Sequence, residues 1–364
     1  MNIGIVDADI IGRKKHRFPN LVSMKLSAYH KSLGDNVTLV TDYDTTDKYD
    51  KCYVSKVFTA TSTPDDIMDR GNVYCGGTGF YYDKAEPLPY EIEHIMPDYH
   101  LYDEWIDKMV RGGAKLSQFQ FYRDYSIGFL TRGCFRQCEF CVNKNYKSCI
   151  KHSSVNEFYD NTRKKMCFLD DNFFACKNWR TIISEVKQIN KPFIFKQGLD
   201  ERLLTKEKIE EMLSWKYIGR YIFAFDNIKD YDLIKAKLDL MKSITNKPCT
   251  FYVLCGYDYN NKYDLEFWQH DIIDLFKRIE LLGAYGHYPY IMRHNNYNQS
   301  PYKGTYTNIA NWCNMPHLYT QMSYYEFCYK ANERCKKESS QMRYYKQSLE
   351  IPNIEKYTQR CFFK

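Results

Sequence analysis

Thr131-Arg-Gly-Cys-Phe-Arg-Gln-Cys-Glu-Phe-Cys141 is the stretch that decides the fold of this chain. It places three thiols, Cys134, Cys138 and Cys141, at the spacing C-x3-C-x2-C. Thiolate is a soft ligand that selects zinc or iron–sulfur clusters. A structural zinc takes four protein ligands, whereas a [4Fe–4S] cluster held by three cysteines leaves one iron open to an outside molecule. The spacing therefore indicates a metal centre of one of these two kinds.

The stretch resembles the signature of the radical S-adenosylmethionine (radical SAM) superfamily, in which an aromatic residue, here Phe140, precedes the last cysteine. In that family the amino and carboxylate groups of SAM chelate the open iron. One electron from the reduced cluster then splits the sulfonium and yields a 5′-deoxyadenosyl radical, which abstracts hydrogen from a substrate. The resemblance implies a [4Fe–4S] cluster on the three cysteines, SAM as a second cofactor, and a reducing partner of the flavodoxin or ferredoxin type.

The alternative is a zinc site with Cys149 as the fourth ligand, in a non-enzymatic protein that binds nucleic acid. The formal net charge of +7 and the 34 tyrosines are compatible with that function. Zinc sites, however, usually use paired C-x2-C spacings. The regular strand–helix pattern downstream also has no role in a zinc-binding module, so the radical SAM interpretation is favoured.

The chain downstream of the cysteines alternates short apolar runs with amphipathic segments. This alternation predicts parallel strands joined by helices, because neighbouring parallel strands need a long crossover connection. Six strand–helix units predict an open, partial (β/α)6 barrel of the TIM type, the fold that the family resemblance also implies. The expected strands are 125–130, 165–169, 193–196, 221–225, 250–255 and 288–292, and the expected helices are 179–189, 206–213, 230–244 and 264–282.

The first 115 residues predict a separate α/β domain, a Rossmann-like parallel sheet. A helix is expected to open at Pro19-Asn20 and to stop at Gly34-Asp35, and Asp7 to Arg17 is expected to be a loop. The expected strands are 3–6, 37–40 and 52–57.

This segment resembles the N-terminal domain of cobalamin-binding-type radical SAM proteins. The pattern that carries the resemblance is Pro19-Asn20-Leu21, Lys25-Leu26, Tyr29 and Leu33-Gly34. The family members that ligate cobalt from below use a D-x-H-x-x-G motif, and this sequence has none. We therefore expect no bound cobalamin.

Two stretches are expected to lead from this domain to the barrel. Gly76-Gly-Thr-Gly79, after the apolar run 73–75, is expected to be a tight turn, and a similar turn recurs at this place in the cobalamin-type relatives. Residues 81–115 carry three prolines and several acidic residues, which indicates an interdomain connection with a helix near 102–110. The expected domains are 1–115, 116–299 and a small helical C-terminal extension, 300–364.

The chain has 14 cysteines, and its first residues run directly into a strand pattern rather than a signal peptide. These features predict a reducing, cytoplasmic location. No apolar stretch is long enough to span a bilayer, so no membrane association is expected. The cysteines of the tail are spaced too irregularly to predict a second cluster; they are Cys313, Cys328, Cys335 and Cys361.

The SAM-binding residues are expected at the carboxyl ends of the barrel strands, where reactive residues gather in parallel α/β folds. Phe168-Leu-Asp-Asp-Asn-Phe173 resembles the F-x-D-D-x-F run of the cobalamin-type relatives. Asp170 or Asp171 is therefore the expected acceptor for the SAM ammonium, with an N-cap role for Asp171 as the alternative. Arg202 is the expected donor to the SAM carboxylate, with a surface ion pair as the alternative.

The remaining SAM contacts follow the same rule. Ribose hydroxyls suit Gln197, Asp200 or Asp226, and adenine is expected to stack by Phe140 with Tyr257 nearby. Methyl transfer through cobalamin is disfavoured by the missing histidine motif, and methylthio transfer by the lack of a cysteine trio before the signature. No catalytic residue is predicted, and the substrate class stays open among peptides, nucleic acids and small molecules.

Overall fold

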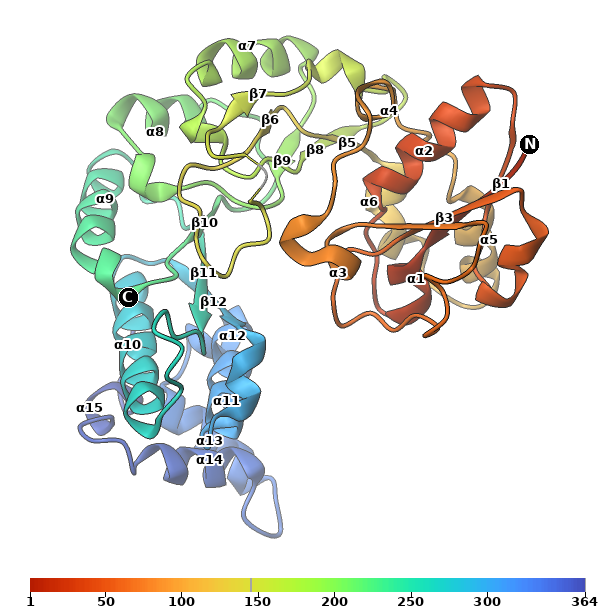
Figure 1. Cartoon of the computed structure of the whole chain (residues 1–364). Coiled ribbons are helices and arrows are strands. Elements are labelled where there is room, and N and C mark those ends of the chain that lie inside the picture. The colour runs from red at the N-terminus through yellow and green to blue at the C-terminus, as the bar shows by residue number, and fades with distance from the viewer. Residues whose placement is uncertain (145, 364) are drawn as a thin grey trace. The chain divides into compact units, whose positions relative to one another are not determined.

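The computed structural model of the chain describes residues 1–144 and 146–363. The chain divides into two compact units, Met1–Gln197 and Gly198–Lys364, whose elements are labelled in Figure 1. Both are mixed α/β with parallel sheets, as predicted. The domain bounds 1–115, 116–299 and 300–364 stay a prediction. Within the described residues, no helix is both long enough and apolar enough to cross a membrane.

The first unit begins with a four-stranded parallel sheet in the order β2-β1-β3-β4. The chain adds β2 on one side of β1 and then returns to add β3 on the other side, with Ile5 opposite both Leu39 and Tyr53. The sequence predicted the first three strands, whereas it predicted only an apolar run at the fourth. The strands are β1 (Asn2–Asp7), β2 (Asn36–Leu39), β3 (Lys51–Ser55) and β4 (Val73–Gly76).

The helix α2 (Leu21–Ser32) forms where the sequence predicted it. The side chain of Asn20 caps its first turn by accepting from the Ser23 amide at 3.2 Å. The predicted loop from Asp7 to Arg17 is partly wrong, because residues 8–12 form a short helix, α1 (Ala8–Gly12), with Asp7 as its N-cap. One turn of helix is too short to show the apolar periodicity on which the prediction relied.

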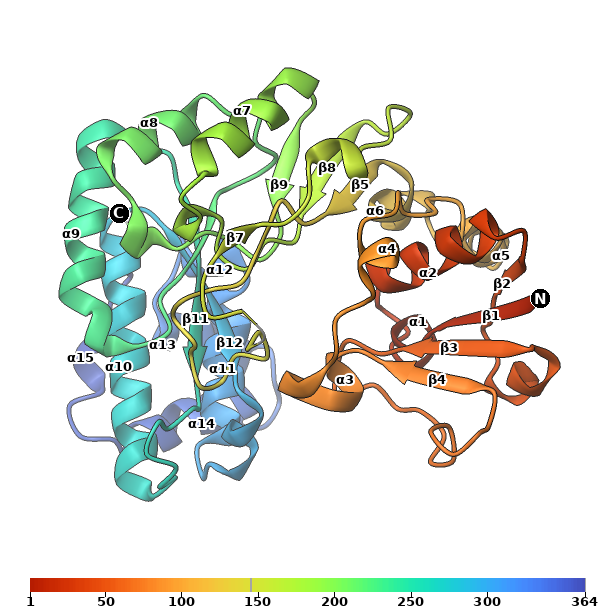
Figure 2. The ribbon, with the colours of Figure 1, turned by 45° about the horizontal axis from the view of Figure 1, so that its top comes forward.

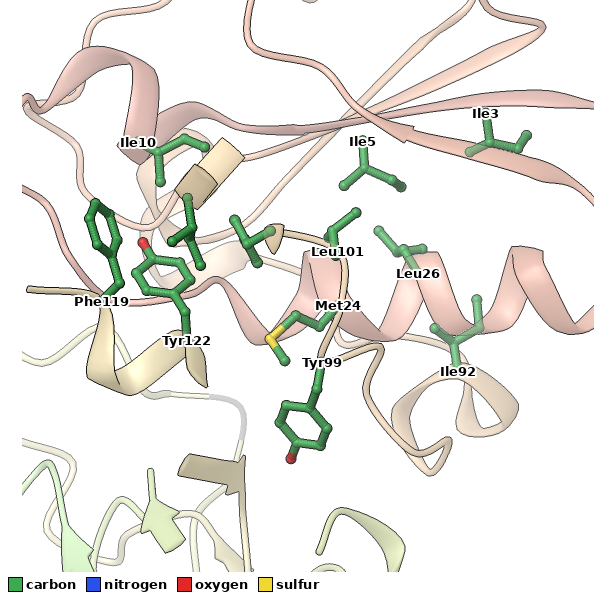
Figure 3. Close-up of a cluster of buried hydrophobic side chains, with 12 residues drawn as sticks. Ile3, Ile5, Ile10, Met24, Leu26, Ile92, Tyr99, Leu101, Phe119 and Tyr122 are labelled. Carbon is green, nitrogen blue, oxygen red and sulfur yellow. The ribbon is translucent and has the colours of Figure 1, made fainter. Parts of the chain in front are cut away.

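The segment 81–115 packs into the core of the first unit and does not simply connect domains. Its two helices, α4 (Tyr90–Glu93) and α5 (Asp103–Arg111), contribute Ile92 and Ile106 to a cluster with Ile3 and Ile5 of β1. Figure 3 shows Ile3 and Ile5 on the strand facing Leu26 of α2, with Ile92 beside the helix. The prolines and acidic residues of the segment suggested an exposed connection, although its apolar side chains are buried in the core.

Tyr99, at the margin of this cluster, joins it to the next sheet. Its hydroxyl donates to the Phe158 carbonyl at 2.6 Å and accepts from the Ile127 amide at 2.8 Å. In Figure 3 the hydroxyl points away from Ile3 and Ile5. This sheet is parallel, in the order β5-β8-β9. Its strands are β5 (Tyr125–Gly128), β8 (Lys165–Phe168) and β9 (Phe193–Phe195), and the helix α7 (Trp179–Ile189) connects β8 to β9 along the chain.

The second unit has its own parallel sheet in the order β10-β11-β12. Figures 1 and 2 show α10 and α11 flanking these strands. All six predicted strands of the barrel region are present, but their hydrogen bonds group them three and three, so the single partial barrel stays a prediction. The strands are β10 (Ile222–Ala224), β11 (Thr250–Cys255) and β12 (Tyr288–Arg293), and the helices beside them are α8 (Lys206–Leu213), α9 (Tyr231–Ile244) and α10 (Leu265–Ala284).

The tail is helical, as predicted, and its buried rings contact α10: the Tyr319 hydroxyl donates to the Ile279 carbonyl at 3.2 Å, and the Tyr324 ring centroid lies 5.6 Å from that of Phe276. Trp312, Tyr319 and Tyr324 are fully buried there, and the indole of Trp312 donates to the Met322 carbonyl at 3.1 Å. The helices are α11 (Lys303–Cys313), α12 (Pro316–Tyr319), α13 (Tyr324–Glu333), α14 (Ser340–Ser348) and α15 (Glu355–Thr358).

Gly128, the last residue of β5, tests how the sheet packs before the cysteine stretch. A Cβ at this position would lie 2.4 Å from the ring of Phe158, which is buried. We expect Gly128→Ala to destabilise the fold by about 1–3 kcal/mol, because the ring has no free space to move into. Gly71→Ala, whose Cβ would meet nothing within 4 Å, is the control and should leave the thermal midpoint unchanged or slightly raised. Equal midpoints for both variants would contradict this packing.

Candidate functional site

The cysteine stretch is a loop whose two ends are paired with each other. Two-residue strands, β6 (Thr131–Arg132) and β7 (Ile150–Lys151), form an antiparallel ribbon at its base. Gly133 follows with φ 93°, and a Cβ there would lie 2.3 Å from the Ser148 carbonyl oxygen, so this position requires glycine. We call residues 133–149 the cysteine loop. The ribbon was not predicted from the sequence, because strands of two residues carry no periodic signal.

Asp170, just after β8, fixes the start of the ribbon. Its carboxylate accepts from the Thr131 amide at 2.7 Å, from the Thr131 hydroxyl at 2.6 Å and from the Leu130 amide at 3.2 Å. The side chain is 1 % exposed. Burial raises the pKa of Asp170 to about 7, against the opposing effect of the Thr131 and Leu130 donors.

The next two residues contact the cysteine loop on both sides of its thiols. Asp171 accepts from the Gly133 amide and from the side-chain amide of Asn143, both at 2.7 Å. The side-chain amide of Asn172 donates to the sulfur of Cys134 at 3.3 Å. Asp171 is not the N-cap of a following helix, because its carboxylate binds the cysteine loop and the N-cap positions belong to Asn172 and Asn178. The ammonium-binding role of Asp170 or Asp171 stays a prediction, since the contacts observed are to the loop.

The thiols of the loop fit a thiolate-ligated cluster in their chemistry. Besides the Asn172 contact, the sulfur of Cys134 accepts from the Arg136 amide at 3.5 Å, and that of Cys141 accepts from the Asn143 amide at 3.4 Å. Amide donors to the sulfurs are among the features by which proteins tune iron–sulfur clusters. Burial raises the pKa of Cys141. Within residues 1–144 and 146–363, no three histidine, cysteine or acidic side chains are gathered around one metal position.

Cys149, the fourth ligand in the zinc alternative, lies at the base of the loop and shares a hydrogen bond with the Thr131 side chain. Burial raises the pKa of its thiol to about 12. These contacts give no support to a zinc site that includes Cys149.

Phe140 and Gln197 are the other predicted SAM-binding residues of the first unit. Phe140 is half-buried, and its carbonyl accepts from the Tyr82 hydroxyl at 3.2 Å. The expected turn 76–79 is narrower than predicted, since Gly76 ends β4 and the helix α3 (Thr78–Tyr81) starts two residues later. Tyr82 follows α3, so the chain just after this helix contacts the cysteine loop. Gln197 is exposed just after β9.

In the second unit, Asp200 and Arg202 form one ion-pair network. The guanidinium of Arg202 donates from Nε to Asp200 at 2.8 Å and from Nη1 to Asp230 at 2.8 Å. Its side chain is 17 % exposed, so the ion pair that the sequence offered as an alternative exists but is largely buried. Sequence reasoning missed Asp230, which lies 28 positions along the chain from Arg202.

Two acidic groups near this network have raised pKa values. Burial raises the pKa of Asp226, a predicted ribose contact, to about 6, and the nearby Arg278 opposes that shift. Glu201, which the sequence analysis did not single out, is fully buried, and burial raises its pKa to about 8. Its Oε2 accepts from the Ala224 amide at 3.2 Å, while its Oε1 has no hydrogen-bond partner among the described residues. Charged residues on both sides of Glu201 were the signal that could have identified it.

Tyr257 lies at the carboxyl end of the second sheet, where β11 and β12 end together. Its ring centroid is 4.8 Å from that of His294, at an interplanar angle of 75°. Arg278 closes the same end by donating to the carbonyls of Phe225, Asp226 and Leu254 at 2.8 to 3.1 Å. Tyr257 and Asp226 thus lie at the strand ends where the sequence placed them. Their contacts with SAM stay predictions.

Comparison with known proteins gave no family model and no curated protein that matches the chain. Among solved structures, the chain is similar to the radical SAM methyltransferase TsrM from Kitasatospora setae, with cobalamin and a [4Fe–4S] cluster bound. The TM-score is 0.49 at 10% identity, over 80% of this chain and 74% of that one.

The chain is also similar to the cobalamin-dependent SAM radical enzyme OxsB with aqua-cobalamin bound, at a TM-score of 0.35 and 13% identity. For apo OxsB the TM-score is 0.34 and the identity 11%. The chain spans 49% of the length of OxsB.

Glu201 provides a test of the second unit's buried charges. Its pKa in the fold lies above the ordinary value of 4.5, so the stabilisation from its protonated form is complete below about pH 4.5 and is lost as the pH rises through about 8. Glu201→Gln cannot ionise. Between about pH 5 and about pH 8, the free energy of unfolding should therefore fall less in the variant than in the wild type, by on the order of 1–3 kcal/mol.

Denaturant unfolding at the two pH values measures this difference. Glu210→Gln, at an exposed position on the same stretch of chain, is the control and should follow the wild type. A Glu201→Gln variant with the same pH dependence as the wild type would show that Glu201 is ionised in the fold.

Proposed function

We propose that this chain is a radical SAM enzyme in which Cys134, Cys138 and Cys141 bind a [4Fe–4S] cluster and SAM binds the open iron. The observation that carries the proposal is the placement of the cysteine loop. It leaves the carboxyl end of β5 in a parallel sheet and is held there by residues from the carboxyl end of β8. Reactive residues gather at this end of parallel strands.

When bound, the cluster and SAM supply the one-electron cleavage that produces a 5′-deoxyadenosyl radical, and the protein supplies ligation and orientation. The chain's own contribution is to hold the loop. Asp170 and Asp171 fix the backbone before the first cysteine, and Asp171 also binds Asn143, two residues after the last cysteine. Amide donors from Asn143, Arg136 and Asn172 point at the ligand sulfurs.

SAM contacts are part of the proposal. Phe140 and Tyr257 are proposed beside adenine, Gln197, Asp200 and Asp226 near the ribose, and Arg202 near the carboxylate, with Asp170 or Asp171 as the ammonium acceptor. In the second unit, burial raises the pKa of Asp226. Arg202 already binds the carboxylates of Asp200 and Asp230. The reducing partner is proposed to be of the flavodoxin or ferredoxin type, and the location cytoplasmic.

Cobalamin is proposed to be absent from the N-terminal sheet, because the cobalt-ligating motif is missing from the sequence. Anaerobic incubation with hydroxocobalamin and removal of the free cofactor should leave no cobalamin absorbance on the protein. Retention of one equivalent would reverse this part of the proposal and bring methyl transfer back into consideration.

Two cysteine variants separate the cluster from the zinc alternative. After anaerobic reconstitution, the wild type should carry about four iron and four sulfide per chain and should form 5′-deoxyadenosine when dithionite and SAM are added. Cys138→Ala should lose the cluster and lower 5′-deoxyadenosine formation at least about a hundredfold, because one of three iron ligands is missing.

Cys149→Ala is the matched control, since the same substitution removes a thiol at the base of the loop that the cluster does not use. It should keep wild-type iron, sulfide and 5′-deoxyadenosine formation. Purified wild type that holds zinc and no iron, and loses the zinc in Cys149→Ala, would instead establish the zinc-binding protein.

A further inference from the structure

Three consecutive side chains after β8, Asp170, Asp171 and Asn172, each reach a different point of the cysteine loop or its base. Asp170 holds the Thr131 backbone at 2.7 Å. Asp171 holds Gly133, one residue before the first cysteine. Asn172 reaches a sulfur atom itself. Consecutive residues after this strand thus contact Thr131, Gly133 and Cys134 at the start of the stretch, and Asp171 also contacts Asn143 after its last cysteine.

The two carboxylates act on the backbone and on the far side of the loop. Because Asp171 accepts from both Gly133 and Asn143, it joins the residue before Cys134 to the second residue after Cys141. All three thiols therefore lie between the two points that this one side chain holds. Asp170 is buried with its oxygens bound to Leu130 and Thr131, which fixes the direction in which the loop starts.

Asn172 has a different kind of contact. Its amide donates to the Cys134 sulfur at 3.3 Å, and this contact holds no backbone group. Asn172 is 4 % exposed, so water does not compete freely for the bond. A hydrogen bond to a ligand sulfur stabilises the more negative, reduced state of an iron–sulfur cluster and raises its reduction potential.

We propose that Asp170, Asp171 and Asn172 form a positioning element for the proposed cluster, in which the carboxylates hold the cysteine loop and Asn172 sets the reduction potential through Cys134. This inference rests on the proposed function. It gives the two carboxylates a loop-holding role beside the ammonium contact proposed above, because the contacts observed are to the loop.

The test is a redox titration of the reconstituted Asn172→Leu variant, which keeps a side chain of similar volume and removes the amide donor. Iron and sulfide content should match the wild type. The reduction potential of the cluster should fall, so dithionite should reduce it by one electron less readily. At the wild-type midpoint the ratio of reduced to oxidised cluster should be about tenfold lower, which corresponds to about 59 mV for a one-electron couple. Asn156→Leu, at an exposed position outside the cysteine loop, is the control and should titrate as the wild type.

A conservative variant separates potential from structure. Asn172→Gln retains an amide donor and should titrate between the wild type and Asn172→Leu, whereas a purely structural role would leave the midpoint unchanged in any variant that holds a full cluster. An unchanged midpoint in Asn172→Leu, with full iron and sulfide, overturns the assignment of Asn172 while the cluster itself stands. A wild type that binds no iron overturns the proposed function.

The carboxylates have a readout that needs no cluster. In Asp171→Asn one of the two loop donors loses its acceptor, because a single amide oxygen replaces two carboxylate oxygens. Hydrogen–deuterium exchange of the apo chain should then be faster in peptides covering Gly133 and Asn143, and unchanged in peptides of α2. Exchange equal to the wild type across the loop would overturn the role of Asp171. Asp69→Asn, an exposed acid outside the loop, is the control.

Discussion

The buried carboxylate of Asp170 is the contact on which the arrangement of the cysteine loop depends. A carboxylate taken out of water is tolerated only where other donors replace the lost hydrogen bonds. Here those donors are groups of Leu130 and Thr131, the residues through which the chain leaves β5. These hydrogen bonds compensate for burying Asp170 only when the chain leaves β5 in the direction that brings Leu130 and Thr131 to its carboxylate. Asp171 and Asn172, the next two residues, contact Gly133 and the sulfur of Cys134.

The sequence predicted those elements whose own residues carry the signal. The helices α7 and α8 and the strand β11 were predicted to the residue, because apolar periodicity, caps and flanking polar residues agree at each of them. The ribbon β6–β7 and the short helix α1 were not, since two to five residues show no period. The burial of segment 81–115 also escaped prediction, because it depends on contacts with β1 that lie far away in sequence.

The site divides in the same way. The thiol spacing and the acidic pair after β8 were visible in the sequence, and they lie together at the carboxyl end of one sheet. Their partners were not visible. The pairing of Arg202 with Asp230 and the bond from Asn172 to Cys134 join residues 28 and 38 positions apart. Sequence patterns identify candidate residues, whereas the tertiary fold determines which of them are in contact.

The narrow base of the loop has a consequence for how such a protein is assembled in a cell. Since β6 pairs with β7 and the strands β5 and β8 pair with each other, the described residues of the cysteine loop contribute no strand to the β5-β8-β9 sheet. The pairing of β5 with β8 therefore involves no residue of the proposed cluster site, and the proposed cluster would be added to a sheet that is already paired. Folding of the sheet and insertion of the proposed cluster are then separable events.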